Sequence, residues 1–551
     1  MHNGPANRNC PTRLRDFVLE EESGVFTHPQ TDSDAEREPE YRDGAEEHLL
    51  NVFKNTTDLT ACSESLQKEA RDWPTQYHLG QERSHILKAL GIEGNLKVLE
   101  LGCGCGALSR YLGETCRAVD CVEGSLTRAK ICRERCRDLN NVRVYHSKIS
   151  EAMWEPAYDI VTLIGVLEYA PMYFSGLPQQ ACSKLLEAAG SALNADGVLL
   201  TAIENRIGLK YWTGAPDDHT NTLFDGLHGY PAKKSAVTFS KKELQSLLSH
   251  AALEHIHFYH CFPDYKFAST VFSSLGDDEL MYLHNWIDVP FKQPQGKREY
   301  NMHEGLVLRT LSKAGLLRQL ANSLLIVASK TDVSCLLKPN WIAKKISGFP
   351  RRRQYRCITT LNISNGLSIE KKKFDDNKPI KGDLTAVAEN PLVRHSAANS
   401  PWYPGDLLLY DIYEALLSCD FRKHLIEILD RYYRELISRF HTGKTDSCGY
   451  PLLHGACFDF VPRNIVNNDN ELVPIDEEWS CRDEIPADYV LFRCINNDIV
   501  STQYPYMKKQ RGDSRNFTIE IIRVFLPQYN KRRYKQNEET ERNLLATLTV
   551  S

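Results

Sequence analysis

The sequence has no long hydrophobic run. No window of its 551 residues approaches 18 uninterrupted apolar residues, so we expect no transmembrane helix. The N-terminal text, MHNGPANRNCPTRLRDF, also lacks the apolar core of a secretory signal. The 17 cysteines are scattered rather than dense, which favours reduced intracellular thiols. We therefore expect a cytoplasmic protein.

An excess of positive charge is lacking as well. Lys and Arg number 67 and Asp and Glu number 72, which gives a formal net charge of −5. A protein that holds nucleic acid usually has a basic excess, so we expect no nucleic-acid partner. Hydrophobic residues make up 42% of the chain, enough to form packed cores. At roughly 100–200 residues per domain, the length indicates two to four domains.

The segments of the chain differ in character. Residues 1–48 are polar and acidic, which predicts a disordered, solvated tail. Residues 49–332 alternate apolar strands with helices, as in an α/β fold with a Rossmann-like, doubly wound parallel sheet. Residues 267–320 interrupt this alternation and are predicted to be an insertion with helices of its own. Residues 333–505 predict a second, α+β domain, and residues 506–551 a C-terminal helical tail.

A glycine-rich turn follows the first strand of the predicted sheet. It reads Glu100-Leu101-Gly102-Cys103-Gly104-Cys105-Gly106, and its glycines permit a tight bend and a close approach of ligand to backbone. Glu123 ends the next strand, where a carboxylate can accept both ribose hydroxyl hydrogens. Glu100 would repel a pyrophosphate but could hold the ammonium group of an amino acid. The pattern favours S-adenosylmethionine over NAD; the alternative is a structural turn that binds no ligand.

Short sequence segments spread over residues 72–330 resemble those of class I S-adenosylmethionine-dependent methyltransferases. They are WPTQYHL, VLELGCGCGALSRYLGE, VEGSLTRA, LIGVLEYAP, IENRIGLKYWTGAPDDHT, FDGLHGY and FPDYK. The likeness is greatest to the bacterial branch found with glycosyltransferases in surface-polysaccharide biosynthesis. The resemblance implies O-methylation of a carbohydrate or glycan-linked acceptor, and a glycosyltransferase as a partner.

The same resemblance implies a set of cofactor-binding residues. The methionine end would be lined by the residues of the turn, Glu100, Gly102, Gly104 and Gly106. Glu123 would bind the ribose, and Ile164 and Gly165 would lie beside the cofactor. One departure is His146-Ser147-Lys148, where many of these enzymes have a carboxylate for the adenine amine; Ser147 or a backbone group would have to serve. Tyr77 could cover the cofactor, or it could simply pack.

A hydroxyl acceptor is helped by a general base whose pKa lies near the operating pH. We predict His219, in the polar loop Asp217-Asp218-His219, as this base, and Glu168 as the second choice. Glu168 follows a strand at the edge where ligands of open α/β sheets bind. The alternative is that His219 only hydrogen-bonds within its loop. FDGLHGY and FPDYK could hold a sugar or be structural.

The second domain contains a kinase-like spacing. Asp459, Asn464 and Asp476 match an arrangement in which one Asp orients a hydroxyl while the Asn and the second Asp hold Mg²⁺. The region resembles the kinase-like phosphotransferase fold, which includes aminoglycoside phosphotransferases, and Lys371 could contact the phosphates of ATP. No glycine-rich loop is visible, the helix Glu cannot be placed, and IDEEW replaces D-F-G. An active kinase, an inactive nucleotide-binding scaffold and a chance resemblance stay open.

We therefore predict an S-adenosylmethionine-dependent methyltransferase that acts on a glycan. The alternatives are a bifunctional methyltransferase-kinase that modifies a glycan end, and a non-catalytic scaffold that binds a glycosyltransferase. ATP with Mg²⁺ is expected only if the kinase-like domain is active. We expect no further metal centre, because Cys448, His454 and Cys457 lack regular zinc-ligand spacing.

Overall fold

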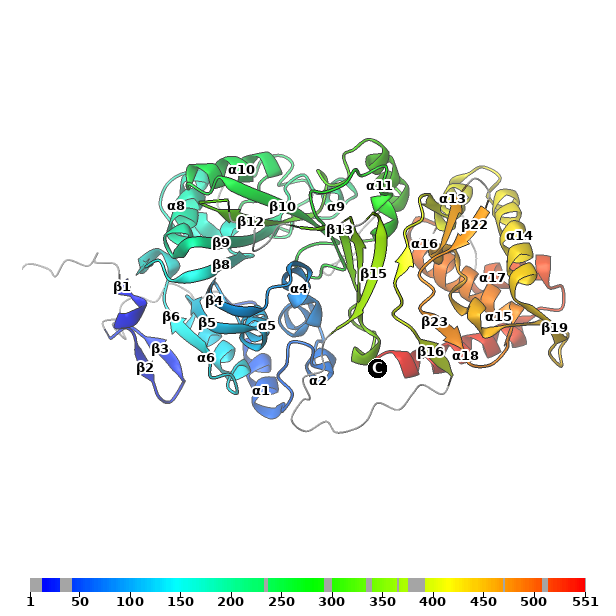
Figure 1. The fold of residues 1–551 in the computed structure, drawn as a ribbon, viewed down its shortest axis with the longest axis horizontal. Coiled ribbons are helices and arrows are strands. Elements are labelled where there is room, and N and C mark those ends of the chain that lie inside the picture. The colour runs from blue at the N-terminus through cyan, green and yellow to red at the C-terminus, as the bar shows by residue number, and fades with distance from the viewer. Residues whose placement is uncertain are drawn as a thin grey trace, which may run out of the picture. The chain divides into compact units, whose positions relative to one another are not determined.

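The computed structural model divides into two compact units, in which the elements are labelled in Figure 1. Unit 1 comprises Met1–Ser274 and Gln319–Pro339, and unit 2 comprises Leu275–Arg318 and Asn340–Ser551. The structure describes residues 12–29, 42–231, 236–291, 300–332, 339–363, 366–374, 392–468, 471–507 and 514–550.

Unit 1 is built on a mixed sheet. Its strand order is β11-β10-β12-β9-β8-β4-β5-β6-β3-β2. The central strands are β4 (Gly94–Leu101), β5 (Cys116–Glu123), β6 (Val142–His146), β8 (Tyr158–Ile164) and β9 (Leu193–Glu204). These five are parallel, as the alternation of strands and helices predicts.

The strands beyond β9 correct the expectation of an all-parallel sheet. β12 (Ser323–Ser329) runs antiparallel to β9, and β10 (His255–Phe262) runs antiparallel to β12. β11 (Thr270–Phe272) pairs antiparallel with β10. Among the described residues of unit 1, no helix lies between β10 and β12, so no crossover returns the chain to the parallel direction.

Helices cover both faces of the central strands (Figure 1). α8 (Pro178–Ser191) and α10 (Lys241–His250) share one apolar core with the strand residues Leu99, Leu101, Leu163 and Ile203. Side chains alternate between the faces of a strand, so Glu100 points to the opposite face. There its carboxylate meets Ser109 of α5 (Ala107–Thr115). The strand ends that carry the predicted site therefore lie between two helical layers.

Part of the N-terminal segment is ordered, which corrects the prediction of a solvated tail for residues 12–29. β2 (Val18–Glu20) and β3 (Val25–Thr27) form a hairpin, and β3 adds to the sheet beside β6. Phe26 stacks on Tyr145, with ring centroids 4.9 Å apart. The few apolar residues of an acidic segment are enough to attach it to the sheet. α1 (Glu46–Asn55) follows, and residues 1–11 and 30–41 lie outside the described residues.

Unit 2 combines a small antiparallel sheet with a helical core. The sheet contains β13 (Trp341–Ile346), β14 (Cys357–Asn362), β15 (Ser368–Lys373) and β17 (Ser400–Pro401). β14 and β15 pair antiparallel. The helices that pack together are α13 (Leu408–Leu417), α14 (Phe421–Phe440), α15 (Ala487–Phe492), α17 (Ser514–Phe525) and α18 (Lys531–Leu548).

Short strands complete unit 2. β16 (Val393–His395) pairs with β23 (Trp479–Cys481), and β18 (Asp406–Leu407) pairs with β21 (Ile465–Asn468). β21 also pairs with β22 (Glu471–Pro474). Another small sheet consists of β19 (His441–Thr445), β20 (Pro451–Leu453) and β24 (Ile485–Pro486).

Two predicted boundaries differ from the structure. The segment expected as an insertion of the first domain does contain a helix, α11 (Glu304–Lys313), but it groups with unit 2. His284 in this segment binds Asp406, with Nε2 2.8 Å from Oδ1. The C-terminal residues are not a tail either, because Ile522 and Leu544 are buried in the core of unit 2. Both features depend on contacts between distant parts of the sequence.

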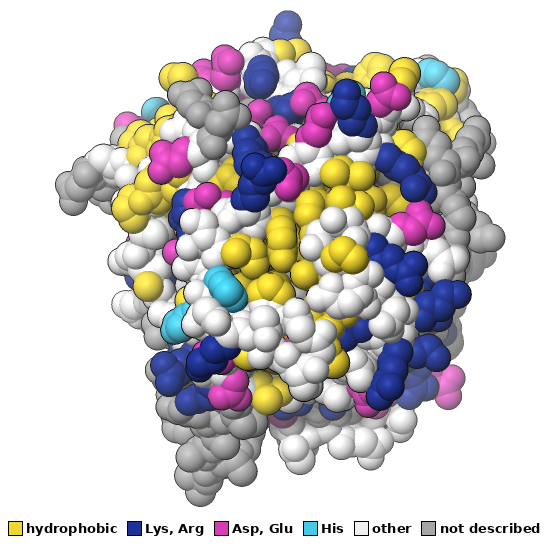
Figure 2. Space-filling model, turned by 90° about the vertical axis from the view of Figure 1, so that its right-hand side faces the viewer, with side chains coloured by type: hydrophobic (Ala, Val, Ile, Leu, Met, Phe, Trp, Pro, Cys, Tyr) yellow, Lys and Arg dark blue, Asp and Glu magenta, His cyan; other side chains and the backbone are white. Residues whose placement is uncertain are grey.

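The described helices include none that is long and apolar enough to cross a membrane. Figure 2 shows one face on which hydrophobic side chains gather in the middle while Lys and Arg lie around them.

Candidate cofactor and acceptor site

The glycine turn after β4 uses its three glycines in two ways. All three have left-handed backbones, with φ of +78° at Gly102, +56° at Gly104 and +83° at Gly106. A Cβ on Gly102 would lie 2.6 Å from Val166, and one on Gly106 would lie 3.0 Å from the sulfur of Cys132. At Gly104 the nearest atom would be 3.7 Å away, on Arg128. Packing therefore requires the outer two glycines, whereas the middle one keeps free space over the turn.

Glu123 lies against this turn. Its Oε2 accepts a hydrogen bond of 2.8 Å from the amide of Gly104, and its Oε1 accepts one of 3.0 Å from the amide of Ser125. The carboxylate is buried and held by backbone at the carboxyl end of β5, where ligands of open α/β sheets bind. Each oxygen keeps a lone pair for a ligand hydroxyl. The residue that the sequence predicts for the ribose thus lies beside the middle glycine.

Glu100 lies at the strand–helix junction on the other side of the turn. Its Oε2 accepts hydrogen bonds from the hydroxyl of Ser109, at 2.5 Å, and from the thiol of Cys121, at 3.6 Å. Burial raises the pKa of Glu100 to about 8. A carboxyl group that holds its proton at neutral pH attracts an ammonium group weakly. The predicted contact of Glu100 with the methionine end stays a prediction.

A charged group that the sequence analysis missed borders the turn. Arg128 on α6 (Leu126–Arg135) is buried, and its Nη2 lies 3.3 Å from Oδ2 of Asp43 and 3.1 Å from Nε2 of His78. His78 and Asp43 are themselves 2.8 Å apart. Asp43 comes from the segment expected to be disordered, so no local signal pointed to it. The cluster fixes the segment before α1 against the glycine turn.

The remaining predicted cofactor residues lie on neighbouring strand ends. Ser147 follows β6 and donates its amide to the backbone carbonyl of Glu123 at 3.0 Å. Ile164 ends β8, and a Cβ on Gly165 would lie 2.5 Å from the hydroxyl of Tyr265. Tyr77 is half-buried in α3 (Trp73–Leu79). The guanidinium of Arg83 lies 4.1 Å from its ring centroid.

His219 is held on both ring nitrogens. Nε2 lies 3.3 Å from Oε2 of Glu204, and Nδ1 lies 3.2 Å from the hydroxyl of Tyr169. Burial opposes the charged imidazolium, but Glu204 and then Glu168 outweigh it and raise the pKa of His219 to about 9. His219 is therefore protonated at neutral pH and cannot accept a proton there. We therefore place Glu168 ahead of His219 as the candidate base, and both roles stay predictions.

Glu168 fits the role of a base better. Its side chain is 1% exposed, and its Oε2 has no hydrogen-bond partner among the described residues. Burial raises its pKa to about 7, with a further contribution from the negative charge of Glu204. Ligand-type atoms of Glu168, Glu204 and His219 all lie within 4.8 Å of one another. The carboxyl group of Glu168, which titrates near neutrality, thus lies close to the cationic imidazole of His219.

Lysines balance the acidic charge of this cluster. Lys266 binds Glu204 directly and lies 3.1 Å from Oδ1 of Asp218, and Lys210 lies 2.6 Å from Oδ2 of the same Asp. Burial opposes ionisation of Glu204, yet Lys266 and His219 lower its pKa to about 2. Glu168, Glu204 and His219 are close enough to hold a metal ion, but Lys266 already supplies positive charge to Glu204.

The predicted kinase-like residues of unit 2 also come together. Lys371 of β15 is buried and forms an ion pair with Asp476, whose φ is +57°. Asp459 accepts the amide of Trp479 at 2.6 Å, and Asn464 donates to the carbonyl of Asp459 at 3.2 Å. Burial raises the pKa of Asp459 to about 7. The partner of Lys371 that the sequence did not reveal is Glu478, whose Oε2 lies 3.5 Å from Nζ.

Comparison with known proteins bears on unit 1. Residues 99–199 match the family model of a methyltransferase domain, and they include the glycine turn, Glu123, Gly165 and Glu168. This part of the chain therefore matches a methyltransferase domain. An uncharacterized methyltransferase of Schizosaccharomyces pombe is 26% identical, over 34% of this chain and 81% of the yeast protein.

Solved structures align with parts of the chain at low scores. A methyltransferase of Thermotoga maritima is 17% identical, with a TM-score of 0.27, over 46% of this chain and 91% of that one. A phosphoethanolamine N-methyltransferase of Haemonchus contortus, in complex with S-adenosylhomocysteine, is 14% identical, with a TM-score of 0.28, over 46% of this chain and 52% of that one.

Two residues that the sequence analysis did not identify, Glu204 and Lys266, lie in the cluster of the predicted bases. Glu204 ends β9 as Glu123 ends β5, so its position at a strand end could have revealed it. Lys266 belongs to the phrase FPDYK, which the sequence analysis considered for sugar binding. In the structure, Tyr265 and Lys266 are both buried, and the role of FPDYK in sugar binding stays a prediction.

Proposed function

We propose that the methyltransferase domain transfers a methyl group from S-adenosylmethionine to a hydroxyl group, with Glu168 as the general base. The observation that carries this proposal is the buried, unpartnered Oε2 of Glu168, which lies three residues after Gly165 beside the cationic side chain of His219. A base of this kind has to be dry, near neutral in pKa and available to a substrate proton.

The cofactor end of the site fits the nucleoside. Glu123 offers two backbone-oriented oxygens to ribose hydroxyls, and Gly104 leaves room for a ligand over the turn. When bound, S-adenosylmethionine supplies an electrophilic methyl group. The protein contributes alignment, because the displacement requires the acceptor oxygen and the methyl group in line.

The proton step follows from the charges of the cluster. In its ionised form, Glu168 would accept the proton of the acceptor hydroxyl on Oε2. His219 stabilises that ionised form beforehand, because its positive charge lies near Glu168. Glu204 holds His219 in place and keeps it protonated. Positioning by His219 replaces the base role that the sequence predicted for it.

The acceptor class that we propose is a carbohydrate or a glycan-linked hydroxyl, supported by the phrases that resemble the polysaccharide-associated branch. The test is mass spectrometry of a glycan extract incubated with the protein and methyl-labelled S-adenosylmethionine. We expect a product heavier by one labelled methyl group. Label that appears only on protein or lipid would contradict the acceptor class but not the transferase.

A second candidate function concerns unit 2. Lys371, Asp459, Asn464 and Asp476 are the residue types with which a phosphotransferase holds phosphates and Mg²⁺, and Lys371 lies next to Asp476 while Asn464 lies next to Asp459. This arrangement supports a bifunctional methyltransferase-kinase that modifies a glycan end. If unit 2 neither binds nor hydrolyses ATP, the alternative is a scaffold that binds a glycosyltransferase.

A further inference from the structure

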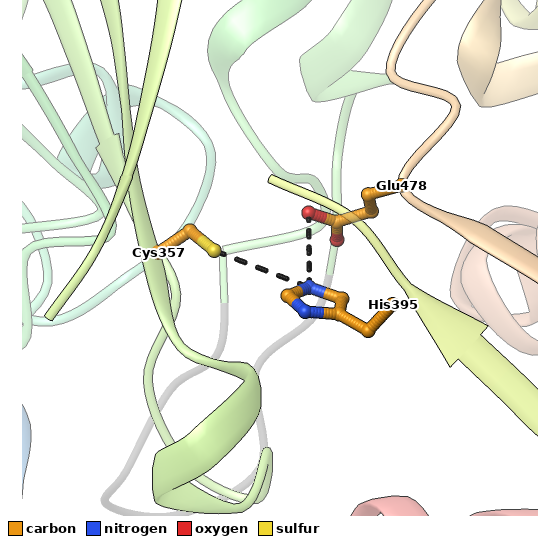
Figure 3. Close-up of side chains that lie close together, drawn as sticks. All are labelled: Cys357, His395 and Glu478. Atoms are coloured by element: carbon orange, nitrogen blue, oxygen red, sulfur yellow. Dashed lines mark hydrogen bonds and ion pairs between the residues drawn. The ribbon is translucent and has the colours of Figure 1, made fainter. Parts of the chain in front are cut away.

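Unit 2 contains three metal-ligating side chains that converge on one point. Cys357 is the first residue of β14, His395 is the last residue of β16, and Glu478 directly precedes β23 (Figure 3). The imidazole Nε2 of His395 lies 4.0 Å from Sγ of Cys357 and 3.7 Å from Oε2 of Glu478. All three ligand atoms lie within 4.8 Å of one another. We propose that these residues bind a zinc-like divalent metal ion.

The distances suit such an ion. Zinc forms tetrahedral bonds of about 2.0–2.3 Å to sulfur, nitrogen and oxygen, which places its ligand atoms roughly 3.3–3.6 Å apart. The two separations from Nε2, 4.0 Å to Sγ and 3.7 Å to Oε2, exceed these by a few tenths of an ångström, and the separation of Sγ from Oε2 is at most 4.8 Å. Thiolate, imidazole and carboxylate are together the set that zinc prefers among divalent ions.

The geometry favours a metal site over a nucleophilic relay. In a relay, the carboxylate orients the imidazole through one ring nitrogen while the nucleophile uses the other. Here Cys357 and Glu478 both face Nε2, as Figure 3 shows. Nδ1 of His395 is buried and has no hydrogen-bond partner among the described residues. A single cation between sulfur, nitrogen and oxygen satisfies all three atoms.

The surroundings hold the ligands in position. The ring of His395 packs 4.4 Å from Trp479 and 5.5 Å from Tyr355, measured between centroids. Arg351 binds the other carboxylate oxygen of Glu478, at 2.7 Å. A hydrogen-bonded outer partner of this kind orients a metal-binding carboxylate, and the aromatic rings restrict the orientation of the imidazole. Glu478 would therefore bind the metal through Oε2 alone.

The proposed site shares Glu478 with the kinase-like cluster. Nζ of Lys371 lies 3.5 Å from the same Oε2, and it also binds Asp476. A metal ion on Oε2 displaces Lys371 from Glu478 and leaves it with Asp476. The ion would also join three segments that lie far apart in the sequence, which explains why no ligand spacing revealed them.

The test uses Co²⁺ as the probe with the purified full-length chain. After removal of metal with a chelator, titration with Co²⁺ should produce tetrahedral d–d absorption and a thiolate-to-cobalt charge-transfer band at one ion per chain, and Zn²⁺ should displace it. Cys357→Ser should abolish the charge-transfer band, and His395→Gln should weaken Co²⁺ binding more than tenfold, since even outer partners cost about 10–100-fold. Cys448→Ser, at an exposed cysteine of unit 2, is the matched control and should bind as the unmodified protein does.

Two results would overturn the proposal. One is a wild-type titration without a charge-transfer band, which does not depend on whether any variant folds. The other is an unchanged band in folded Cys357→Ser, with folding checked by circular dichroism. Binding of S-adenosylhomocysteine to unit 1, measured in parallel, distinguishes loss of the metal site from loss of the whole protein.

Discussion

The amide of Gly104 donates a 2.8 Å hydrogen bond to Oε2 of Glu123. The bond joins the turn after β4 to the end of β5, so the carboxylate is oriented by backbone before any ligand arrives. Preorganised acceptors lose little entropy when a ligand binds. This relationship gives the first prediction.

Glu123→Ala should weaken binding of S-adenosylhomocysteine by about 1.5–3 kcal/mol, roughly 10- to 150-fold, because hydrogen bonds to a charged acceptor are lost. Isothermal titration calorimetry measures the change. Glu187→Ala, at an exposed position of α8, is the control and should leave affinity unchanged. Normal affinity in Glu123→Ala would remove Glu123 from the ribose site.

Substitutions at two glycines of the turn should separate packing from ligand binding. Both have positive φ and carry similar backbone strain. Gly102→Ala should lower the melting temperature more, since its Cβ would meet Val166 at 2.6 Å. Gly104→Val should instead abolish binding of S-adenosylhomocysteine while the sheet stays folded. Thermal denaturation and calorimetry together measure both. The reverse pattern would show that Gly104 does not face the cofactor.

The pH dependence of methyl transfer should be bell-shaped. Glu168 acts as a base only when ionised, so kcat/KM should rise with pH through about 7. His219 helps only when protonated, so kcat/KM should fall as pH passes about 9. A profile measured with S-adenosylmethionine and a methyl acceptor tests both limbs. A limb that persists unchanged after the corresponding substitution belongs to another group.

Glu168→Gln should reduce kcat by about 10²–10⁴-fold, the usual contribution of a general base, and leave cofactor affinity intact. His219→Gln should lower kcat less and remove the alkaline limb of the pH profile. Steady-state kinetics with calorimetry on the same samples distinguishes loss of chemistry from loss of binding. Equal turnover in Glu168→Gln would contradict the proposed base.

Lys371→Met should abolish binding of Mg·ATP to unit 2 if the kinase-like cluster is active, because Lys371 is buried beside Asp476. Lys373→Met is the matched control, since Lys373 is exposed on the same strand. Calorimetry with Mg·ATP and an ATP-hydrolysis assay give the readouts. Failure of the unmodified protein to bind Mg·ATP would exclude the phosphotransferase.

The order of strands and helices in unit 1, the glycine turn and Glu123 followed from the sequence alone. Apolar runs of strand length, glycines after a strand and an acid at the next strand end are local patterns, and the covalent order of the chain preserves them. The same holds for Asp459, Asn464 and Asp476, whose spacing along a loop and hairpin fixed their neighbourhood.

The tertiary structure decided what depends on distant residues. Asp43 contacts His78, although the two are far apart in the sequence. Segment 275–318 groups with unit 2 rather than unit 1. β12 runs antiparallel to β9. Protonation states also depended on folding: burial together with Glu204 made Glu168 titratable near neutrality, and Glu204 made His219 a cation. Cys357, His395 and Glu478 come from three separate segments and meet only in space, so no spacing along the chain indicates them.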